Sequence, residues 1–339
     1  MPTPSIVPAE WAPHKAIWTA WPTTADLWFD ELEAVRAEVA AMVKALSSGD
    51  HVRVLACGVD VVSSARQMLG GAAEIIPFDY GDIWLRDTGP VFSRRAADNT
   101  IQAEVFDFNG WGEKYLMPPD DEVAQKLAAL AGASTRKHAF ILEGGAIDAD
   151  GEGTVLTTRQ CLLNPNRNKG WTVAEAEAGL LDAYGARKVI WLGDGLLNDH
   201  TDGHVDNIAR FVGPGRVVCQ APNGPDDPNA ATLLAIEASL REATDAKGRK
   251  LEVLTVPSPG LLTTPGGDPI PASHMNFVIG NKTVVVPTYN ECGEEAVAAL
   301  QGIFRAHDVI GLSARAILTA GGDAPGGGAF HCMTQQEPA

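Results

Sequence analysis

The sequence predicts an α/β fold in which about five similar units close into a propeller-like ring. Two observations support this prediction. A pattern of strand, turn, strand, helix and third strand recurs along the 339 residues, with a period of roughly 60–70 residues that suits a closed array. The loops that follow the third strands also hold most of the unusual polar residues. An ordinary sheet of alternating strands and helices is the alternative interpretation.

The two clearest units lie in the C-terminal half of the chain. Each begins with two apolar strands joined by a short glycine-containing turn, which is typical of a hairpin. A helical stretch and a third strand follow. The expected elements are hairpins at 208–221 and 275–287, helices at about 229–243 and 293–306, and strands at 251–256 and about 308–312.

The other three units fit the pattern more loosely, and the first, from about residue 14 to 78, is enlarged. Nothing in the chain resembles a linker, so we expect a single domain over residues 1–339. The expected strands of these units are 51–56, 74–78, 91–93, 101–106, 139–142, 146–150, 153–158 and 188–192, and the expected helices lie near 27–48, 60–69, 120–132 and 173–184.

Composition limits the classes of function. The net charge of −17 disfavours nucleic-acid binding, which needs a basic face. It suits a cationic ligand, although solubility alone would also explain it. We find no apolar run long enough for a membrane span and no signal peptide. Five scattered cysteines indicate reduced thiols and a cytoplasmic protein; a homo-oligomer is possible.

The C-terminal stretch contains the most unusual pattern. Five glycines fall within residues 321–328, and His331 and Cys332 follow. Glycine is kept where backbone must approach another group closely. We therefore expect a loop that folds inward and carries Cys332 to a site. A flexible tail with a buried cysteine is the alternative.

Three earlier loops carry the remaining polar groups. If the ring closes, the equivalent loops meet at one end of its axis, and these residues share one pocket with Cys332. The groups are Trp84, Arg86 and Asp87 within residues 79–90, Glu143 before Gly144-Gly145, and His200, Asp202, His204 and Asp206 within residues 198–207.

These residues support two chemistries. In a metal-dependent hydrolase, His200, Asp202, His204 and Asp206 would be the ligands. In a thiol enzyme, His204 would be the acid/base for Cys332, and carboxylates would hold a cationic substrate. We prefer the thiol enzyme because the metal site leaves Cys332 unexplained.

Four motifs together resemble the agmatine deiminase family. They are Trp84–Pro90 (WLRDTGP), Glu143–Gly145 (EGG), Gly203–Asn207 (GHVDN) and Gly326–Pro338 (GGGAFHCMTQQEP). This family belongs to the guanidine-modifying superfamily, whose fold is a five-bladed α/β propeller, the pentein. The resemblance covers almost the whole chain. Bacterial peptidyl-arginine deiminases share the same broad family.

The resemblance implies a role for each matching residue. Cys332 matches the nucleophile and His204 the general acid/base. Asp87 and Asp206 match the carboxylates that grip the guanidinium, and Glu143 matches the acid that orients the histidine. Trp84 and Gly328 fall at substrate-binding positions. The resemblance implies no metal and no cofactor.

The implied reaction is hydrolysis of agmatine to N-carbamoylputrescine and ammonia through a covalent cysteine thiouronium, on a route to putrescine and polyamines. A peptidyl- or free-arginine deiminase of the same fold is the first alternative. A metal-dependent hydrolase using His200 and His204 is the second. A catalytically silent ring that binds a polyamine is the third.

Substrate choice depends on the groups near the pocket. His274 and residues 288–291 depart from the common family pattern and bear on selectivity. Arginine would need a cation for its α-carboxylate. The candidate cations are Arg86, Arg159, Arg167 and Lys169, and we expect Arg86 to be used in an ion pair with Asp87. This favours agmatine.

Overall fold

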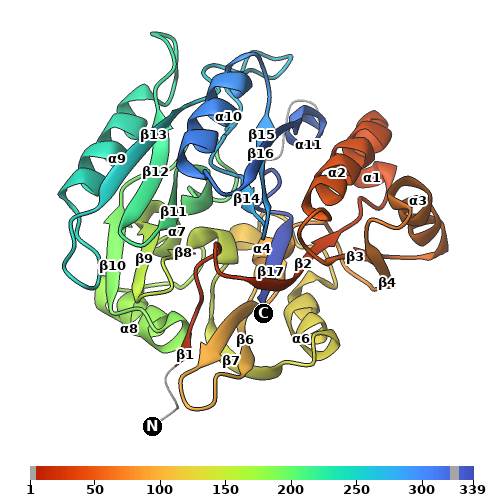
Figure 1. Cartoon of the computed structure of the whole chain (residues 1–339), viewed down its shortest axis with the longest axis horizontal. Helices are drawn as coiled ribbons and strands as arrows, with labels where there is room; N and C mark the ends of the chain where they lie inside the picture. Colours follow the sequence, from red (N-terminus) through yellow and green to blue (C-terminus); the bar gives the residue numbers. More distant parts are fainter. Residues whose placement is uncertain (1–4, 321–327) are drawn as a thin grey trace.

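Five small sheets surround the centre of the molecule (Figure 1). The computed structural model describes residues 5–320 and 328–339, so residues 321–327 of the predicted glycine loop lie outside the described part of the chain. Each sheet contains an antiparallel strand pair and a third strand that runs parallel to its neighbour. This is the predicted repeat, because a parallel third strand needs a crossover connection such as a helix.

Four sheets follow this order along the chain without interruption. In the first of them, β1 (Ser5–Ile6) adds a further strand at the edge beside β5. The strands are β5 (Val91–Arg95), β6 (Ile101–Asp107) and β7 (Ser134–Ile141); β8 (Asp148–Ala149), β9 (Thr154–Thr158) and β10 (Lys188–Leu192); β11 (Ala209–Gly213), β12 (Arg216–Ala221) and β13 (Glu252–Pro257); and β14 (Val278–Ile279), β15 (Thr283–Thr288) and β16 (Asp308–Ser313).

The fifth sheet closes the ring with the two ends of the chain. Its order is β17 (Thr334–Pro338), β2 (His14–Ala20), β3 (Val52–Ala56) and β4 (Glu74–Pro77). The C-terminal strand β17 runs antiparallel to β2 and supplies the strand that the first unit lacks. The sequence analysis expected no strand at 334–338, because QQEP has no apolar alternation to indicate one.

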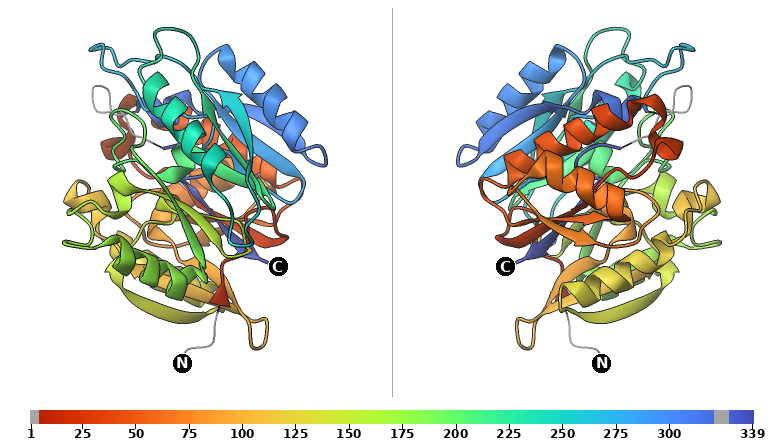
Figure 2. Two further views of the ribbon diagram at one scale, coloured as in Figure 1. Left: turned by 90° about the vertical axis from the view of Figure 1, so that its left-hand side faces the viewer. Right: turned by 90° about the vertical axis from the view of Figure 1, so that its right-hand side faces the viewer.

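The longer helices lie around the outside of the ring, and the side views show the same arrangement (Figures 1 and 2). They cover the sheets with one apolar face each. In α8, for example, a Thr172–Glu175 capping box begins the helix and left-handed Gly185 ends it. The six are α2 (Leu32–Leu46), α3 (Val59–Leu69), α6 (Asp120–Leu130), α8 (Val173–Tyr184), α9 (Ala230–Glu242) and α10 (Cys292–Ile303).

Short helices lie in the connections between the longer elements. Three of them immediately follow or contain predicted site residues. They are α1 (Ala25–Trp28), η1 (Phe29–Glu31), α4 (Leu85–Thr88), α5 (Gly110–Glu113), η2 (Gly144–Ala146), α7 (Arg159–Leu162), η3 (Val205–Asn207) and α11 (Arg315–Thr319).

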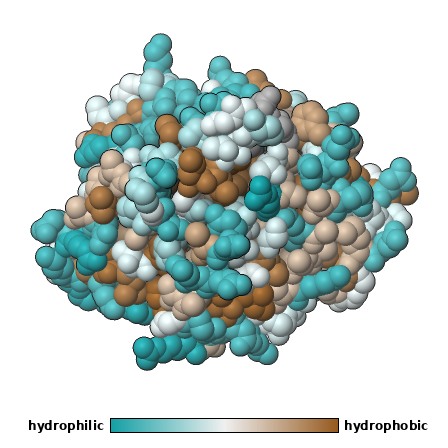
Figure 3. Space-filling model, turned by 90° about the horizontal axis from the view of Figure 1, so that it is seen from above, coloured by the Kyte–Doolittle hydropathy of each residue, from teal (hydrophilic) through white to brown (hydrophobic). Residues whose placement is uncertain are grey.

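The surface seen from above mixes hydrophilic and apolar residues in separate small areas (Figure 3). None of the helices in the described residues combines the length and apolar character that crossing a bilayer requires.

Candidate active site

Loops from all five blades bring chemistry-bearing side chains to one site. Asp87 lies in α4, after β4, and Glu143 directly follows β7. His204 precedes η3, which contains Asp206, after β10. Asn276 lies between β13 and β14, and Cys332 precedes β17. The predicted convergence of the loops that follow the third strands is therefore what the fold produces.

Asn276 fixes the cysteine and its loop. Its Nδ2 donates a hydrogen bond to Cys332 Sγ at 3.0 Å. Its Oδ1 accepts from the backbone N–H groups of Ala329, His331 and Cys332 at 3.1, 3.0 and 3.2 Å. One buried side chain thus sets both the backbone conformation and the position of the sulfur.

Two buried aspartates meet His204 around Gly145. Asp87 accepts hydrogen bonds from Gly145 N and Trp111 Nε1, both at 2.9 Å. A Cβ on Gly145 would lie 2.6 Å from His204 Nδ1, 2.9 Å from Asp87 Oδ1 and 3.1 Å from Asp206 Oδ2. The three polar groups therefore surround one point, and only glycine leaves them room there.

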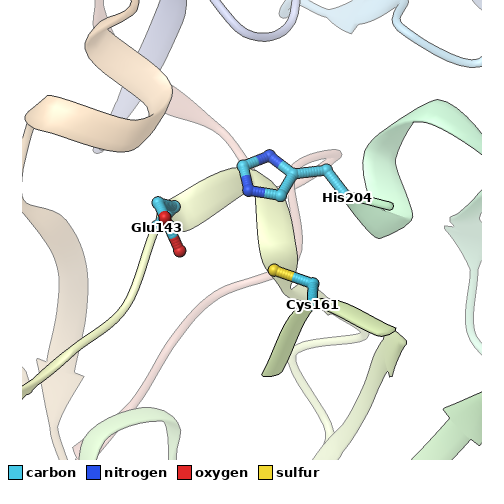
Figure 4. A group of neighbouring side chains, drawn as sticks. All are labelled: Glu143, Cys161 and His204. Atoms are coloured by element: carbon cyan, nitrogen blue, oxygen red, sulfur yellow. The ribbon is translucent and has the colours of Figure 1, made fainter. Parts of the chain in front are cut away.

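His204 is completely buried beside Glu143 and Cys161 (Figure 4). Its Nδ1 lies 3.8 Å from Asp87 Oδ2. Burial by itself lowers the pKa of His204, but Asp87, Cys161 and Glu143 together raise that pKa well above its usual value. Neither ring nitrogen has a hydrogen-bond partner among the described residues. The surroundings of His204 therefore favour its protonated form, in which both ring nitrogens are donors.

Arg167 fixes the carboxylate of Glu143. Its Nε donates to Glu143 Oε1 at 2.7 Å, and both side chains are 1% exposed. Arg167 also contacts Asp202 and donates to the carbonyl of Thr201 at 3.0 Å. These contacts tie the Glu143 loop to the loop that carries His204.

The ionisation of the remaining groups follows from their partners. Burial, and then Asp206 and Asp87, raise the pKa of the Cys332 thiol well above its usual value. Burial also raises the pKa of Asp87, and His204 opposes this. Although burial acts in the same direction on Asp206, a hydrogen bond with His331 and the charge of that ring lower its pKa. Without a bound cation, therefore, Cys332 is a thiol and Asp206 is an anion.

A cavity of about 320 Å³ opens beside Cys332. Trp84 forms part of its wall and donates from Nε1 to Asp82 Oδ2 at 2.8 Å. A Cβ on Gly328 would lie 2.7 Å from the Trp84 ring, so glycine allows the indole to contact the cysteine loop. The lining residues are Asp26, Leu27, Trp28, Phe29, Asp82, Trp84, Asp87, Trp111, Tyr115, Met117, His200, Thr201, Ile317, Ala320, Gly328 and Cys332.

The four residues of the metal alternative do not form one ligand set. His200 Nδ1 contacts the Tyr115 hydroxyl at 2.7 Å, and Asp202 pairs with Lys114 at 2.7 Å and with Arg167. Within residues 5–320 and 328–339, the group with metal-ligand spacing is instead Glu143, Cys161 and His204, whose donor atoms lie within 4.8 Å of one another.

That group does not fit a resident metal ion well. Glu143 already accepts from Arg167, whose positive charge opposes a cation. Burial raises the pKa of the Cys161 thiol, whereas metal binding requires a thiolate. The arrangement is better suited to holding a proton on His204.

The candidate cations for an arginine carboxylate lie outside the cavity wall. Arg86 donates to Gln335 Oε1 at 2.9 Å and to the carbonyl of His331 at 3.4 Å. The expected ion pair of Arg86 with Asp87 was wrong, because ring closure places β17 against α4. Arg159 lies over the Trp191 ring at 5.3 Å. Neither Arg167 nor Lys169 lines the cavity.

His274, one of the departures from the family pattern, has structural contacts away from the cavity. His274 is buried, bonds through Nδ1 to the carbonyl of Pro257 at 2.8 Å and stacks on Tyr289. Burial lowers its pKa to about 4, so it is a neutral ring. It does not line the cavity.

Sequence reasoning missed several residues of the site. Asn276 follows the third strand of its unit, so the rule that found the other loops could have found it. Cys161 and Arg167 follow β9, where that rule gives no signal. Glu10 precedes the first expected element, and His331 was noted only as a neighbour of Cys332.

Comparison with known proteins gives a consistent result. The family model of the Porphyromonas-type peptidyl-arginine deiminases matches residues 6–338. The agmatine deiminase of Pseudomonas aeruginosa (strain LESB58) is 37% identical over 357 residues, which cover 98% of this chain and 95% of that protein.

Two solved structures are similar over almost their full length. The agmatine deiminase of Enterococcus faecalis has a TM-score of 0.92 at 31% identity, covering 98% of this chain and 96% of that one. The agmatine deiminase of C. jejuni, solved as a cysteine-to-serine variant with substrate bound, has a TM-score of 0.88 at 27% identity, covering 98% and 96%. These similarities confirm the predicted five-bladed α/β propeller.

The raised pKa of Cys332 predicts its reactivity in the free protein. We expect iodoacetamide to alkylate Cys332 slowly near neutral pH and about tenfold faster for each added pH unit, because the thiolate is the nucleophile. Peptide mass spectrometry measures the rate, with the partly exposed Cys292 as internal reference and Cys332→Ser as the control. A rate that is high at neutral pH and independent of pH would contradict this ionisation state.

Proposed function

The chain belongs to the Porphyromonas-type peptidyl-arginine deiminase family, and we propose that it is an agmatine deiminase. It hydrolyses a carbon–nitrogen bond of agmatine and forms N-carbamoylputrescine and ammonia. One observation carries the choice of substrate: among the described residues, the cavity beside Cys332 is lined by Asp26, Asp82 and Asp87 but by no lysine or arginine. A substrate that is cationic at both ends suits such a cavity.

Asp87 and Asp206 bind the guanidinium group. Both carboxylates are buried and flank Gly145, where they can accept the N–H groups of a planar cation in bidentate fashion. This grip fixes the central carbon near Cys332 Sγ, which is worth several kcal/mol as an orientation effect. The bound cation also offsets the two negative charges that raise the pKa of Cys332, and so it promotes formation of the thiolate.

The reaction then proceeds in two halves. The Cys332 thiolate attacks the central carbon, His204 gives its proton to one terminal nitrogen, and that carbon–nitrogen bond breaks as ammonia leaves. Water takes the place of ammonia, loses a proton to His204 and attacks the thiouronium carbon. The hydroxyl group of this adduct then loses its proton to solvent, where ammonia takes it up as ammonium, and the carbon–sulfur bond breaks, which releases the ureido product and restores the thiolate. Proton transfer by His204 contributes on the order of 10²–10⁴ in rate.

Glu143 and Trp84 support these steps. Glu143, paired with Arg167, lies beside His204 and helps to raise its pKa, so the imidazole keeps the proton that ammonia requires. Trp84 and Gly328 line the cavity next to Cys332 and contact the methylene chain. The likeness to a relative with substrate bound in a cysteine-to-serine variant supports the assignment of Cys332 as nucleophile.

The carboxylates that line the cavity favour an ammonium group over a carboxylate. Burial raises the pKa of Asp82 to about 7, so a nearby cation would favour its ionised form. An arginine substrate would bring its α-carboxylate to the same acids without a paired cation. The second candidate, a deiminase of free or peptidyl arginine, has the family name in its favour.

The cellular setting is also part of the proposal. The product of agmatine deimination leads to putrescine and polyamines. All five cysteines are free, which supports a reducing compartment and hence the cytoplasm. We propose that neither nucleic acid nor membrane is a partner and that homo-oligomers form.

A substrate panel tests the choice of agmatine. We expect kcat/KM for agmatine to exceed that for free arginine and for an arginine peptide at least about 100-fold, because an unpaired buried carboxylate costs about 3 kcal/mol. Ammonia and ureido product are measured together, with Cys332→Ser as the inactive control. Equal or higher kcat/KM for arginine or the peptide would favour the second candidate.

Matched histidine variants test the acid/base assignment. We expect His204→Gln to lower kcat by about 10²–10⁴-fold, because the ring contacts the reacting groups. His200→Gln should keep turnover within about tenfold, because His200 lines the cavity but bonds to Tyr115. Thermal unfolding checks that both variants fold. An active His204→Gln with an inactive His200→Gln would reverse the assignment.

A further inference from the structure

A line of buried charged side chains leads from Asp206 away from the cavity. His331 Nδ1 lies 2.7 Å from Asp206 Oδ2, and His331 Nε2 lies 2.9 Å from Glu10 Oε2. Glu10 pairs with Arg210, and Arg210 pairs with Asp148. All five residues are less than 10% exposed. Of these five residues, only Asp206 takes part in the proposed reaction.

The two contacts of His331 fix its charge. An ionised carboxylate can only accept hydrogen bonds, so a ring bonded to Asp206 and Glu10 at once must donate from both nitrogens. The ring is then an imidazolium, and the charges along the line alternate in sign. Arg210 keeps Glu10 ionised, because its charge and that of His331 lower the pKa of Glu10 despite burial.

Other charged groups around His331 do not reverse this result. Arg86 donates to the carbonyl of His331 at 3.4 Å, and Arg210 faces Glu10. The positive charges of Arg86 and Arg210 disfavour a further positive charge on the His331 ring. However, each is separated from the ring by an acceptor, whereas the two carboxylates contact the ring directly. The adjacent Cys332 is a neutral thiol in the free protein.

The contacts of Asp206 divide its carboxylate into two functions. Oδ2 faces His331 and lies 3.5 Å from Cys332 Sγ. Oδ1 is buried and has no hydrogen-bond partner among the described residues. A buried acceptor without a partner is costly, and a guanidinium N–H would satisfy it. The contact at Oδ2 therefore sets the direction of Oδ1.

We propose that His331 is a positioning residue: by donating from both ring nitrogens, to Glu10 and to Asp206 Oδ2, it orients the Asp206 carboxylate and leaves Oδ1 for the substrate guanidinium. Glu10 anchors the ring, because its Oε1 accepts from Ile279 N at 2.7 Å on β14. A segment near the N-terminus thereby influences a buried carboxylate next to Cys332. The kinetic part of this proposal rests on the proposed deiminase function.

The first test does not depend on turnover. In protein labelled with ¹⁵N-histidine, we expect both ring nitrogens of His331 to carry a proton at neutral pH, because each of them contacts a carboxylate oxygen. The signals are assigned by their loss in His331→Gln. Signals of a neutral ring at neutral pH would overturn the proposal, whatever the substrate is.

The second test separates positioning from general stabilisation. We expect His331→Gln to raise KM for agmatine at neutral pH at least tenfold and to move the acid limb of kcat/KM upward by at least about one pH unit, because a buried carboxylate without its cation binds a proton more tightly. Higher pH should then restore much of kcat/KM. Glu10→Gln should act in the same direction with a smaller shift.

The matched control is another buried histidine–carboxylate pair. His138 Nε2 contacts Glu104 Oε2 at 2.7 Å in the second blade, so His138→Gln should change stability without moving the acid limb or KM. If His331→Gln folds, keeps the KM for agmatine within twofold of wild type and does not move the acid limb of kcat/KM, the proposal is wrong and the residue is structural. Absence of agmatine turnover in wild type would instead refute the proposed function and leave the ¹⁵N result to decide on His331.

Discussion

The site depends on keeping two carboxylates and a thiol close together in a buried environment. Asp87 and Asp206 meet around Gly145, where burial and mutual repulsion oppose ionisation. The two carboxylates differ in their surroundings: His331 lowers the pKa of Asp206, whereas burial raises the pKa of Asp87. A bound guanidinium cation would offset the repulsion between the two carboxylates, and it would also lower the pKa of the Cys332 thiol. Substrate binding and activation of the nucleophile are therefore one electrostatic event.

Most of the fold and the chemical groups could be predicted from local signals. Helix α8 begins and ends where the repeated order of elements placed it, at Val173 and Tyr184. The repeated unit also predicted which loops would meet, and this brought Glu143, His204 and Asp206 together with Cys332. These inferences needed only the order of elements along the chain, because the carboxyl ends of equivalent strands face the same way.

The remaining features arise from contacts between distant segments. Strand β17 completes the first blade, and a strand without apolar alternation is recognised only through its partner β2. Because of that closure, Arg86 donates to Gln335 and does not form the ion pair with Asp87 that the sequence predicted. Likewise, Glu10 reaches His331 across 321 positions of sequence. The side chains that tune the ionisation of the site were therefore the part that the sequence pattern could not supply.

The most direct measurement is rapid acid quenching of the protein during turnover of agmatine, followed by peptide mass spectrometry. We expect the peptide that contains Cys332 to gain the mass of agmatine less that of ammonia, and His204→Gln to change the amount of this adduct. No such adduct should form on the peptide that contains Cys161. Turnover without any adduct on Cys332, or an adduct on another residue, would contradict nucleophilic catalysis by this cysteine.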